Sequence, residues 1–343
     1  MELRSFVLCN ANGDEVCISN FGARILQWHT EVDGSERNIV LGYSSMSDYQ
    51  QDPFYMGAIA GPFANRISHG QCTIDGNEIK LDNNEGNHHL HGGRSALSDQ
   101  FWQVEEQSEQ VLTLSFEQED GYNGYPGPIT FKVVYRLNDE STLIIDMYAT
   151  SEKKTVIGPT SHPYFNLAGN DNDHQNHVLQ ITADQYTPVD EKNIPTGEIA
   201  SVEDTAFDFR QPRILSERDV LDTNFVVGQP VDGGQAILIS PDKKLQLHVK
   251  SDYPGIQIYT GDGLDGKFEP RSGICLEPQF FPNSPNQEDF PFTLTSADKP
   301  FQAQIRYQLV KPTQVIEEND ATTNGKQDSS QPLSNDMDDE WQL

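Results

Sequence analysis

The feature that most constrains the fold of this 343-residue chain is an alternation of apolar and polar residues with a period of two. In the stretch FKVVYRLN, which covers residues 131–138, Phe131, Val133, Tyr135 and Leu137 would share one face of an extended strand. The same pattern recurs in VLTLSFEQ (111–118), STLIIDMYAT (141–150), AILIS (236–240), KLQLHVK (244–250), GIQIYTG (255–261) and AQIRYQLV (303–310). These stretches predict strands with one apolar face each.

Turn signals separate these segments. Asn-Gly pairs stand at 12–13 and 123–124, and Asp-Gly pairs stand at 75–76 and 265–266. No long stretch shows the helical period of 3.6 residues. Many short strands with frequent turns indicate an all-β fold, either a sandwich or a barrel.

The composition changes near the C-terminus. Residues 312–343 contain eight acidic residues and one lysine, with few apolar residues. Such a segment cannot bury enough apolar surface to fold alone. We therefore expect one β-sandwich domain at 1–311 and a disordered acidic tail at 312–343. Trp341 and Leu343 leave open that the tail docks on a partner or a neighbouring subunit.

The formal net charge of −30 excludes whole classes of partner. Binding to nucleic acid or to anionic lipid depends on Lys and Arg, and no cluster of them is visible. A phosphorylated substrate would likewise need a local basic pocket.

The chain also has few signs of export. Its first apolar run, FVLC, has four residues, whereas a secretory signal needs about 7–15 and a membrane span about 18. The four cysteines show no CxxC spacing. We expect a cytoplasmic protein with reduced thiols.

Three histidines lie within four positions in the stretch NHHLHGG, residues 87–93. In an extended strand His89 and His91 would share one face, with His88 on the other. Two histidines on one face could bind a metal ion with a third ligand from elsewhere. Alternatively, each is a hydrogen-bonded histidine, and Gly92 and Gly93 allow a close backbone approach.

A further histidine, His162, lies in TSHPYFNLAG at 160–169. Pro163 blocks a ladder hydrogen bond, so an irregular or edge segment is expected. Tyr164 and Phe165 beside a titratable group are typical of sugar pockets, where a drier site also changes a pKa. A strand end with packed aromatic residues explains the stretch equally well.

The carboxylate of Glu277 follows the apolar run 274–276 and precedes Pro278. We expect it to be half-buried, which raises a carboxyl pKa and suits a general base. An edge glutamate in water is the alternative. Gln279 would point to the same face if the strand continues.

Two other places offer groups that bind hydroxyls. Asn65 and Arg66 combine an amide with a fixed fork of donors. Asp222 lies beside a turn and could accept hydrogen bonds from two adjacent sugar hydroxyls, or could be an ordinary turn aspartate.

Taken together and in this order, these stretches resemble the aldose 1-epimerase family, the galactose mutarotases. The resemblance runs from about residue 3 to about residue 309. It is carried by ANRI (64–67), NNEGNHHLHGG (83–93), HPYFNLAG (162–169), IPTGE (194–198), DTAFDFR (204–210), LDTNF (221–225), YTGDGL (259–264) and EPQFFPNSPNQ (277–287).

The resemblance implies a large antiparallel β-sandwich of the galactose mutarotase type, without cofactor or metal, acting on free aldohexoses such as galactose and glucose as a monomer or weak homodimer. It implies acid/base ring opening, with Glu277 as base on the anomeric hydroxyl and His162 as acid toward the ring oxygen. The implied substrate contacts are Asn65, Arg66, His91, Asp222 and Gln279.

The chain departs from the family pattern at a few positions. Pro62 replaces a usual arginine, Ser161 a usual asparagine, and Asn283-Ser284 a usual Asp-Ala pair. None removes a residue implied in proton transfer, but Pro62 and Ser161 leave the pocket shape and the sugar preference open. A hexose 6-phosphate epimerase, a non-catalytic sugar sensor and a two-carboxylate glycoside hydrolase are the alternatives considered.

Overall fold

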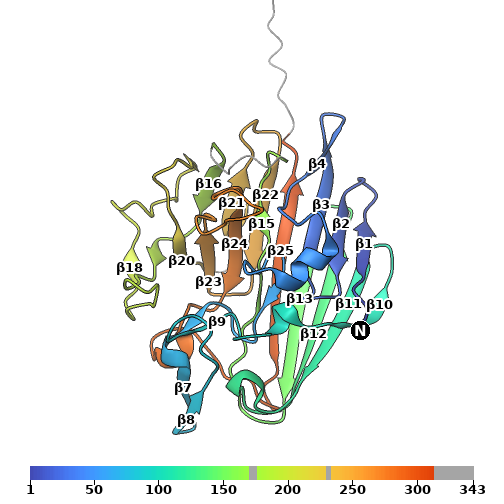
Figure 1. Ribbon diagram of the computed structural model, residues 1–343. Coiled ribbons are helices and arrows are strands. Elements are labelled where there is room, and N and C mark those ends of the chain that lie inside the picture. The colour runs from blue at the N-terminus through green and yellow to red at the C-terminus, as the bar shows by residue number, and fades with distance from the viewer. Residues whose placement is uncertain (170–175, 229–232, 313–343) are drawn as a thin grey trace, which may run out of the picture. The chain divides into compact units, whose positions relative to one another are not determined.

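The computed structural model describes residues 1–169, 176–228 and 233–312. The acidic tail predicted from residue 312 falls almost wholly outside these ranges. Within them the chain consists of β-strands, and its helices are short 3₁₀ segments (Figure 1). The all-β prediction is confirmed.

The largest sheet has nine strands, and every neighbouring pair in it is antiparallel. Its order is β10 (Gln103–Gln107), β11 (Val111–Gln118), β12 (Ile129–Leu137), β13 (Thr142–Ser151), β25 (Phe301–Val310), β22 (Gln246–Ser251), β21 (Ala236–Ile239), β16 (Val178–Ile181) and β19 (Arg213–Ile214). Six of the seven stretches with period-two alternation lie in this sheet, and the seventh, 255–261, contains a strand of the second sheet.

The second sheet has six strands and packs against the first. Its order is β15 (Tyr164–Phe165), β24 (Ile274–Gln279), β23 (Gly255–Tyr259), β20 (Asp222–Val226), β17 (Gln185–Tyr186) and β18 (Ala200–Ser201). The Tyr307 hydroxyl of β25 donates to the carbonyl of Leu276 in β24 at 2.9 Å, and its ring lies 5.1 Å from that of Phe165. These contacts join the two sheets into the predicted sandwich (Figure 1).

A four-stranded sheet carries the N-terminal part of the chain: β1 (Ser5–Cys9), β2 (Glu15–Ser19), β3 (Ile25–Val32) and β4 (Ser35–Asn38). Turns at Asn12-Gly13 and Asp75-Gly76 join β1 to β2 and β7 (Gln71–Ile74) to β8 (Asn77–Lys80), as the sequence predicts.

Two short strand pairs matter for the site because they tie together segments that are far apart in sequence. β5 (Ile59–Ala60) pairs with β14 (Thr160–Ser161), and β6 (Arg66–Ile67) pairs with β9 (His89–Leu90). They bring the ANRI, LHGG and SHPYF stretches to the same end of the six-stranded sheet.

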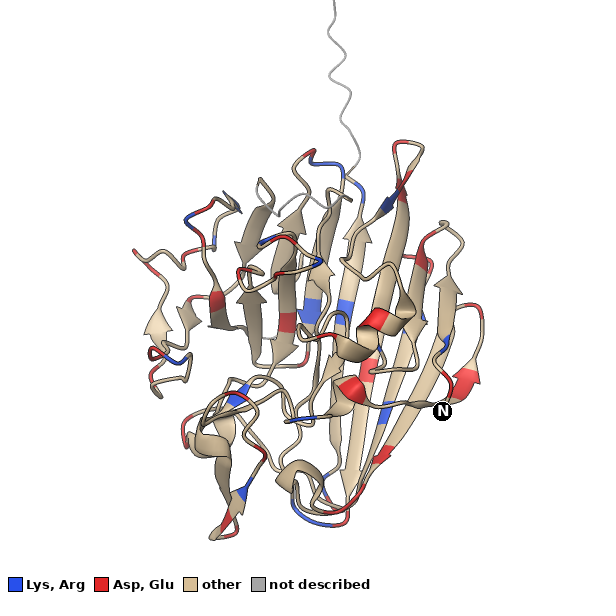
Figure 2. Cartoon of the chain, in the orientation of Figure 1, with Lys and Arg blue, Asp and Glu red and all other residues tan. Residues whose placement is uncertain are grey.

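Charged residues lie mainly on loops and at strand ends, with acidic positions outnumbering basic ones (Figure 2). In the described part of the chain no helix is long and apolar enough to cross a membrane.

Candidate active site

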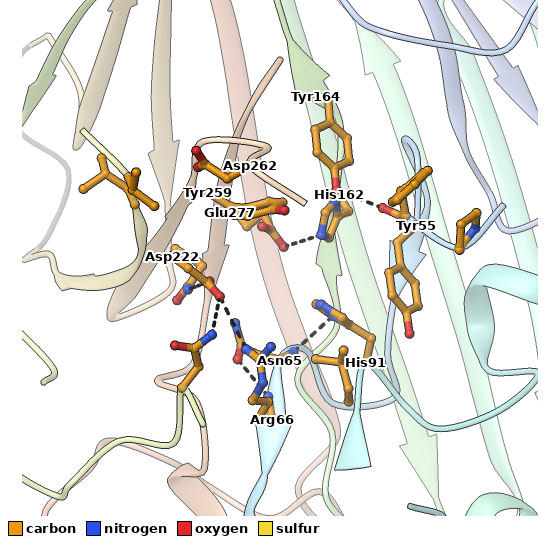
Figure 3. Close-up of a pocket in the computed structure, with 17 residues that line it drawn as sticks. Tyr55, Asn65, Arg66, His91, His162, Tyr164, Asp222, Tyr259, Asp262 and Glu277 are labelled. Atoms are coloured by element: carbon orange, nitrogen blue, oxygen red, sulfur yellow. Dashed lines mark hydrogen bonds and ion pairs between the residues drawn. The ribbon is translucent and has the colours of Figure 1, made fainter. Parts of the chain in front are cut away.

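A pocket of about 400 Å³ opens on one face of the six-stranded sheet. Its volume is in the range of small-molecule sites. Six of the seven residues predicted from the sequence line it, and Figure 3 shows them converging from separate segments: Asn65, Arg66, His91, His162, Asp222 and Glu277. The fold therefore assembles most of the predicted site.

The pocket floor is a row of polar side chains across three strands. In the register of the sheet Asp222 lies opposite Tyr259, and Gln257 lies opposite Glu277. Residues two apart on a strand share a face, so these side chains stand on the pocket side. The apolar Leu276 points the other way into the core.

Glu277 and His162 form the most buried pair of the site. Glu277 Oε2 lies 3.4 Å from His162 Nε2, and the two side chains are only 2% and 6% exposed. The expectation of a half-buried Glu277 was wrong, because β15 and β23 flank β24 on both sides and leave no edge to solvent. Burial raises the pKa of Glu277 well above its usual value, and the nearby Asp222 carboxylate adds to the effect.

His162 changes in the opposite direction. Burial lowers its pKa to about 4. Its second ring nitrogen, Nδ1, lies 3.6 Å from the thiol sulfur of Cys275. The carboxyl and the imidazole thus both favour their neutral forms.

The prediction that His89 and His91 share one face was wrong. His91 adopts a left-handed backbone conformation with φ +49°, so the strand ends before it. His89 points into the core, where its ring contacts the Tyr125 hydroxyl at 2.7 Å and the Asp82 carbonyl. His91 turns into the pocket, 5.3 Å from the His162 ring.

The tautomer of His91 follows from one hydrogen bond. The backbone N–H of Asn65 donates to His91 Nδ1 at 3.2 Å, so that nitrogen is an acceptor and the ring proton is on Nε2. Burial, with the neighbouring His162 and Arg66, lowers the pKa of His91 well below its usual value. His91 is therefore a neutral hydrogen-bond donor.

One group of side chains in the described ranges has metal-ligand geometry, and it contains His91 but not His89, the other histidine of the pair considered from the sequence. Ligand atoms of His91, His162 and Glu277 lie within 4.8 Å of one another. A metal ion on His91 would have to take Nδ1 from the Asn65 N–H or the proton from Nε2. The hydrogen bonding of the group favours donation to an oxygen-rich ligand over metal binding.

The opposite wall of the pocket is an ionic network. Arg66 makes two bonds of 2.7 Å to the Glu85 carboxylate, and its remaining terminal nitrogen lies 3.6 Å from Asp222. Asp222 also accepts hydrogen bonds from Asn193 at 3.1 Å and from Gln257 at 2.6 Å. This network holds amide and carboxylate oxygens at fixed positions in the pocket, where they suit sugar hydroxyls.

Gln279 is the predicted residue that the structure does not bring into the pocket. It shares the strand and face of Glu277 as expected, but its side chain is fully buried and does not line the cavity. It lies two residues, about 7 Å, further along β24, opposite Gly255 of β23.

Sequence reasoning missed several lining residues, including Tyr55, Asn193, Gln257, Tyr259 and Asp262. For Gln257 and Tyr259 a signal existed, since they alternate with Ile256 and Ile258 in the strand GIQIYTG. That polar face suggested solvent, whereas Gln257 is only 3% exposed. Tyr55 and Asn193 lie in loops and show no pattern.

The site defines a class of protein. A buried carboxyl and imidazole 3.4 Å apart, surrounded by side chains that suit hydroxyl groups, are the arrangement expected of an enzyme that moves protons on a small polyhydroxylated substrate.

Comparisons with known proteins agree with this class. Residues 4–308 match the family model of aldose 1-epimerase. The chain is 35% identical over 308 residues to the aldose 1-epimerase of Escherichia coli K12, covering 84% of this chain and 89% of the relative. It is 38% identical over 274 residues to the galactose mutarotase of Bos taurus, covering 75% and 80%.

Solved structures give the same result. The aldose epimerase homologue from C. elegans superposes with a TM-score of 0.87 at 28% identity, covering 91% of this chain and all of that one. The galactose 1-epimerase of Lactobacillus acidophilus gives 0.81 at 28% identity, covering 91% and 96%. The chain belongs to the aldose 1-epimerase family, whose members are isomerases acting at the anomeric carbon of sugars.

Proposed function

We propose that this chain interconverts the α and β anomers of free aldohexoses such as D-galactose and D-glucose. The observation that carries the proposal is the buried Glu277–His162 contact of 3.4 Å in a hydroxyl-binding pocket. Anomerisation removes a proton from one sugar oxygen and adds one to another, which a carboxylate and an imidazole can do together.

In the proposed reaction Glu277 takes the proton of the anomeric hydroxyl while His162 gives a proton to the ring oxygen. The bond between C1 and the ring oxygen breaks and leaves the open-chain aldehyde. Rotation about C1–C2 presents the other face of the carbonyl. Closure reverses both proton transfers, so the pair regains its starting protonation and needs no further reactant.

The reactive form of the pair is an ionised Glu277 beside a protonated His162. Burial disfavours both charges in the empty pocket. A bound sugar adds hydroxyl groups that donate to the carboxylate and accept from the imidazolium, which stabilises the ionised form. Substrate binding thereby prepares the pair for reaction.

Sugar recognition is assigned to Asn65, Arg66, His91 and Asp222, with Gln257 in place of Gln279. His91 donates through Nε2–H, whereas Asp222 accepts. The free sugar is the proposed partner, and we expect a monomer or weak homodimer.

Anionic sugars suit this pocket poorly. Among its described lining residues Arg66 is the only lysine or arginine, and Glu85 already neutralises it. Asp222, Asp262 and Glu277 would repel a phosphate. A hexose 6-phosphate should therefore not compete with galactose.

Polarimetry of freshly dissolved α-D-galactose and α-D-glucose tests the function. We expect wild type to speed the decay of optical rotation, and Glu277→Gln to lower this rate by about 10³-fold. Glu31→Gln, on the exposed face of β3, is the matched control and should behave as wild type. No acceleration by folded wild type would reject the enzyme and favour a sugar sensor, whereas cleavage of aryl glycosides would favour a hydrolase.

A further inference from the structure

A buried ion pair lies behind the pocket, and the proposed reaction makes no use of it. Arg24, just before β3, contacts Asp52, which follows the short helix η1 (Met46–Gln51), and both side chains are fully buried. Neither lines the pocket. Burying two charges usually costs more free energy than their attraction returns, so the pair needs a reason beyond stability.

The pair fixes the loop that follows Asp52. The Asp52 carboxylate accepts the backbone N–H groups of Phe54 at 3.0 Å and Met56 at 2.6 Å, and the Tyr43 hydroxyl at 2.9 Å. Arg24 donates to the carbonyl of Met56 at 3.0 Å. The loop is therefore held through both its N–H and its C=O groups.

The same loop is bonded to the reacting histidine. The N–H of Gly57 donates to the carbonyl of His162 at 3.0 Å, and the N–H of His162 donates to the carbonyl of Ala58 at 2.9 Å. The Tyr164 hydroxyl donates to the carbonyl of Phe54 at 3.1 Å. A displacement of residues 54–58 would move His162 with them.

Tyr55 lies at the tip of this loop with φ +56°, a conformation that non-glycine residues rarely adopt. Its ring lies 4.6 Å from the His91 ring and 6.0 Å from the His162 ring (Figure 3). Next to it a Cβ on Gly57 would lie 1.9 Å from the carbonyl oxygen of Ile25. The loop thus has little room to relax, and the strained Tyr55 is held against both histidines.

We propose that the Arg24–Asp52 ion pair is a positioning element for the reaction, which fixes residues 52–58 and through them the Tyr55 ring and the His162 imidazole. The inference rests on the proposed function of this site. Arg24 and Asp52, which lie outside the pocket, thereby maintain the geometry of proton transfer.

The two charges also act on His162 with opposite signs. Asp52 raises the pKa of His162 and Arg24 lowers it, each less than burial does. Other titratable groups surround the His162 ring and the ion pair. Those around the ring are Glu277 and Cys275 of β24, Tyr164 of β15, His91 after β9, and Tyr55. Those around the pair are Tyr43, Tyr49 and Asp99, which lies 3.8 Å from Arg24.

Two variants with opposite electrostatic effects test the proposal. Asp52→Asn should lower the pKa of His162 and Arg24→Gln should raise it, as read from the pH titration of the His162 ring by NMR. The acid limb of kcat/KM should move in the same two directions. Both variants should lower kcat by about 100-fold, the loss expected for a misplacement of about 1 Å.

Each variant keeps partners for the charge that remains. In Asp52→Asn, Arg24 still has the carbonyls of Met56 and Ser98, and in Arg24→Gln, Asp52 still has three donors. Asp146→Asn is the matched control, because it removes the charge of the buried carboxylate in the Arg136–Asp146 ion pair of the nine-stranded sheet. It should leave kcat within twofold of wild type.

A third variant covers the case in which the charge variants do not fold. Tyr55→Leu removes the ring and keeps the ion pair, and should lower kcat about tenfold with a smaller change in KM. Two results would overturn the proposal. One is a kcat within twofold of wild type in folded Tyr55→Leu. The other is a pKa of His162 that stays at the wild-type value in both Asp52→Asn and Arg24→Gln. The NMR titration needs no activity, so an inactive wild type would reject the proposed function and leave this result readable.

Discussion

The two large sheets are both antiparallel and both bury apolar side chains, but the six-stranded sheet also buries polar side chains along its pocket face. In the nine-stranded sheet the inward residues are apolar, as Leu114 and Val133 illustrate, and alternate with exposed polar ones. In the six-stranded sheet the pocket-facing residues are polar and also buried, as Gln257 and Glu277 illustrate. The nine-stranded sheet stabilises the fold through apolar burial. On the pocket face of the six-stranded sheet, the buried polar groups lower the stability of the fold and form the site.

The pocket face of the six-stranded sheet also contains buried polar atoms that have no hydrogen-bond partner in the described part of the chain. Glu277 Oε2, Gln257 Oε1 and both amide atoms of Gln279 are buried without a hydrogen-bond partner among the described residues. Such groups are rare in folded proteins because each costs about 1–3 kcal/mol. Buried atoms of this kind occur elsewhere too, for example Gln118 Nε2 in β11. Gln257 and Glu277, unlike Gln279, line the pocket, so a bound ligand there would complete the hydrogen bonding of their side chains.

The largest expected effect on stability is in the nine-stranded sheet. Leu114→Ala removes a fully buried side chain from β11 and should lower the free energy of unfolding by about 3 kcal/mol. The pocket lies on the other sheet, so kcat and KM should stay near wild type below the new melting temperature. Urea unfolding together with polarimetry measures both, and a large change in kcat would show that the sheets are not separable in function.

Glu277→Gln should have the reverse profile. The folded chain holds the Glu277 proton more tightly than the unfolded chain does, because its folded-state pKa is raised. That contribution to stability is complete below the unfolded-state pKa of about 4.3 and is lost as the pH rises through the folded-state value. Glutamine does not titrate, so the variant should exceed wild type by about 1–2 kcal/mol at neutral and alkaline pH.

Urea unfolding at pH 5, 7 and 9 measures this gain, which should shrink toward pH 4. A gap that is constant with pH would contradict the raised pKa. A less stable variant at pH 7 would mean that Glu277 stabilises the fold, and the contrast between the sheets would then fail.

The smallest effect concerns substrate binding. Gln257→Ala removes the amide that donates to Asp222 at 2.6 Å and should raise KM for galactose about tenfold with little change in kcat. Gln308→Ala, at a partly exposed position of β25, is the control on the other sheet. Equal KM values for the two variants would remove Gln257 from sugar recognition.

Much of the fold could be predicted because its signal is local. Stretches such as 111–118 and 129–137 could be predicted as strands because apolar and polar residues alternate along them with a period of two. His91 could not be assigned in this way. Its side chain points into the pocket only because its backbone turns to φ +49° at the end of β9, which the pattern NHHLHGG does not specify.

The depth at which the site residues are buried could not be predicted from the sequence either. Glu277 was expected to be half-buried, but β15 and β23 enclose its strand and its side chain is only 2% exposed. Gln279 alternates correctly with Glu277 and still does not line the pocket, because its side chain is fully covered by the segments that pack over it.

From the sequence alone follow seven of the strands, the all-β class, the family and six of the residues that meet in the pocket. These depend on neighbouring positions and on motifs, which the chain carries in linear order. Three other features arise only when distant segments of the chain meet. They are the register that sets Gln257 beside Glu277, the hydrogen bond that keeps the His91 proton on Nε2, and the burial of Arg24 against Asp52. Their energies depend on distances across the folded chain, and residue spacing does not contain them.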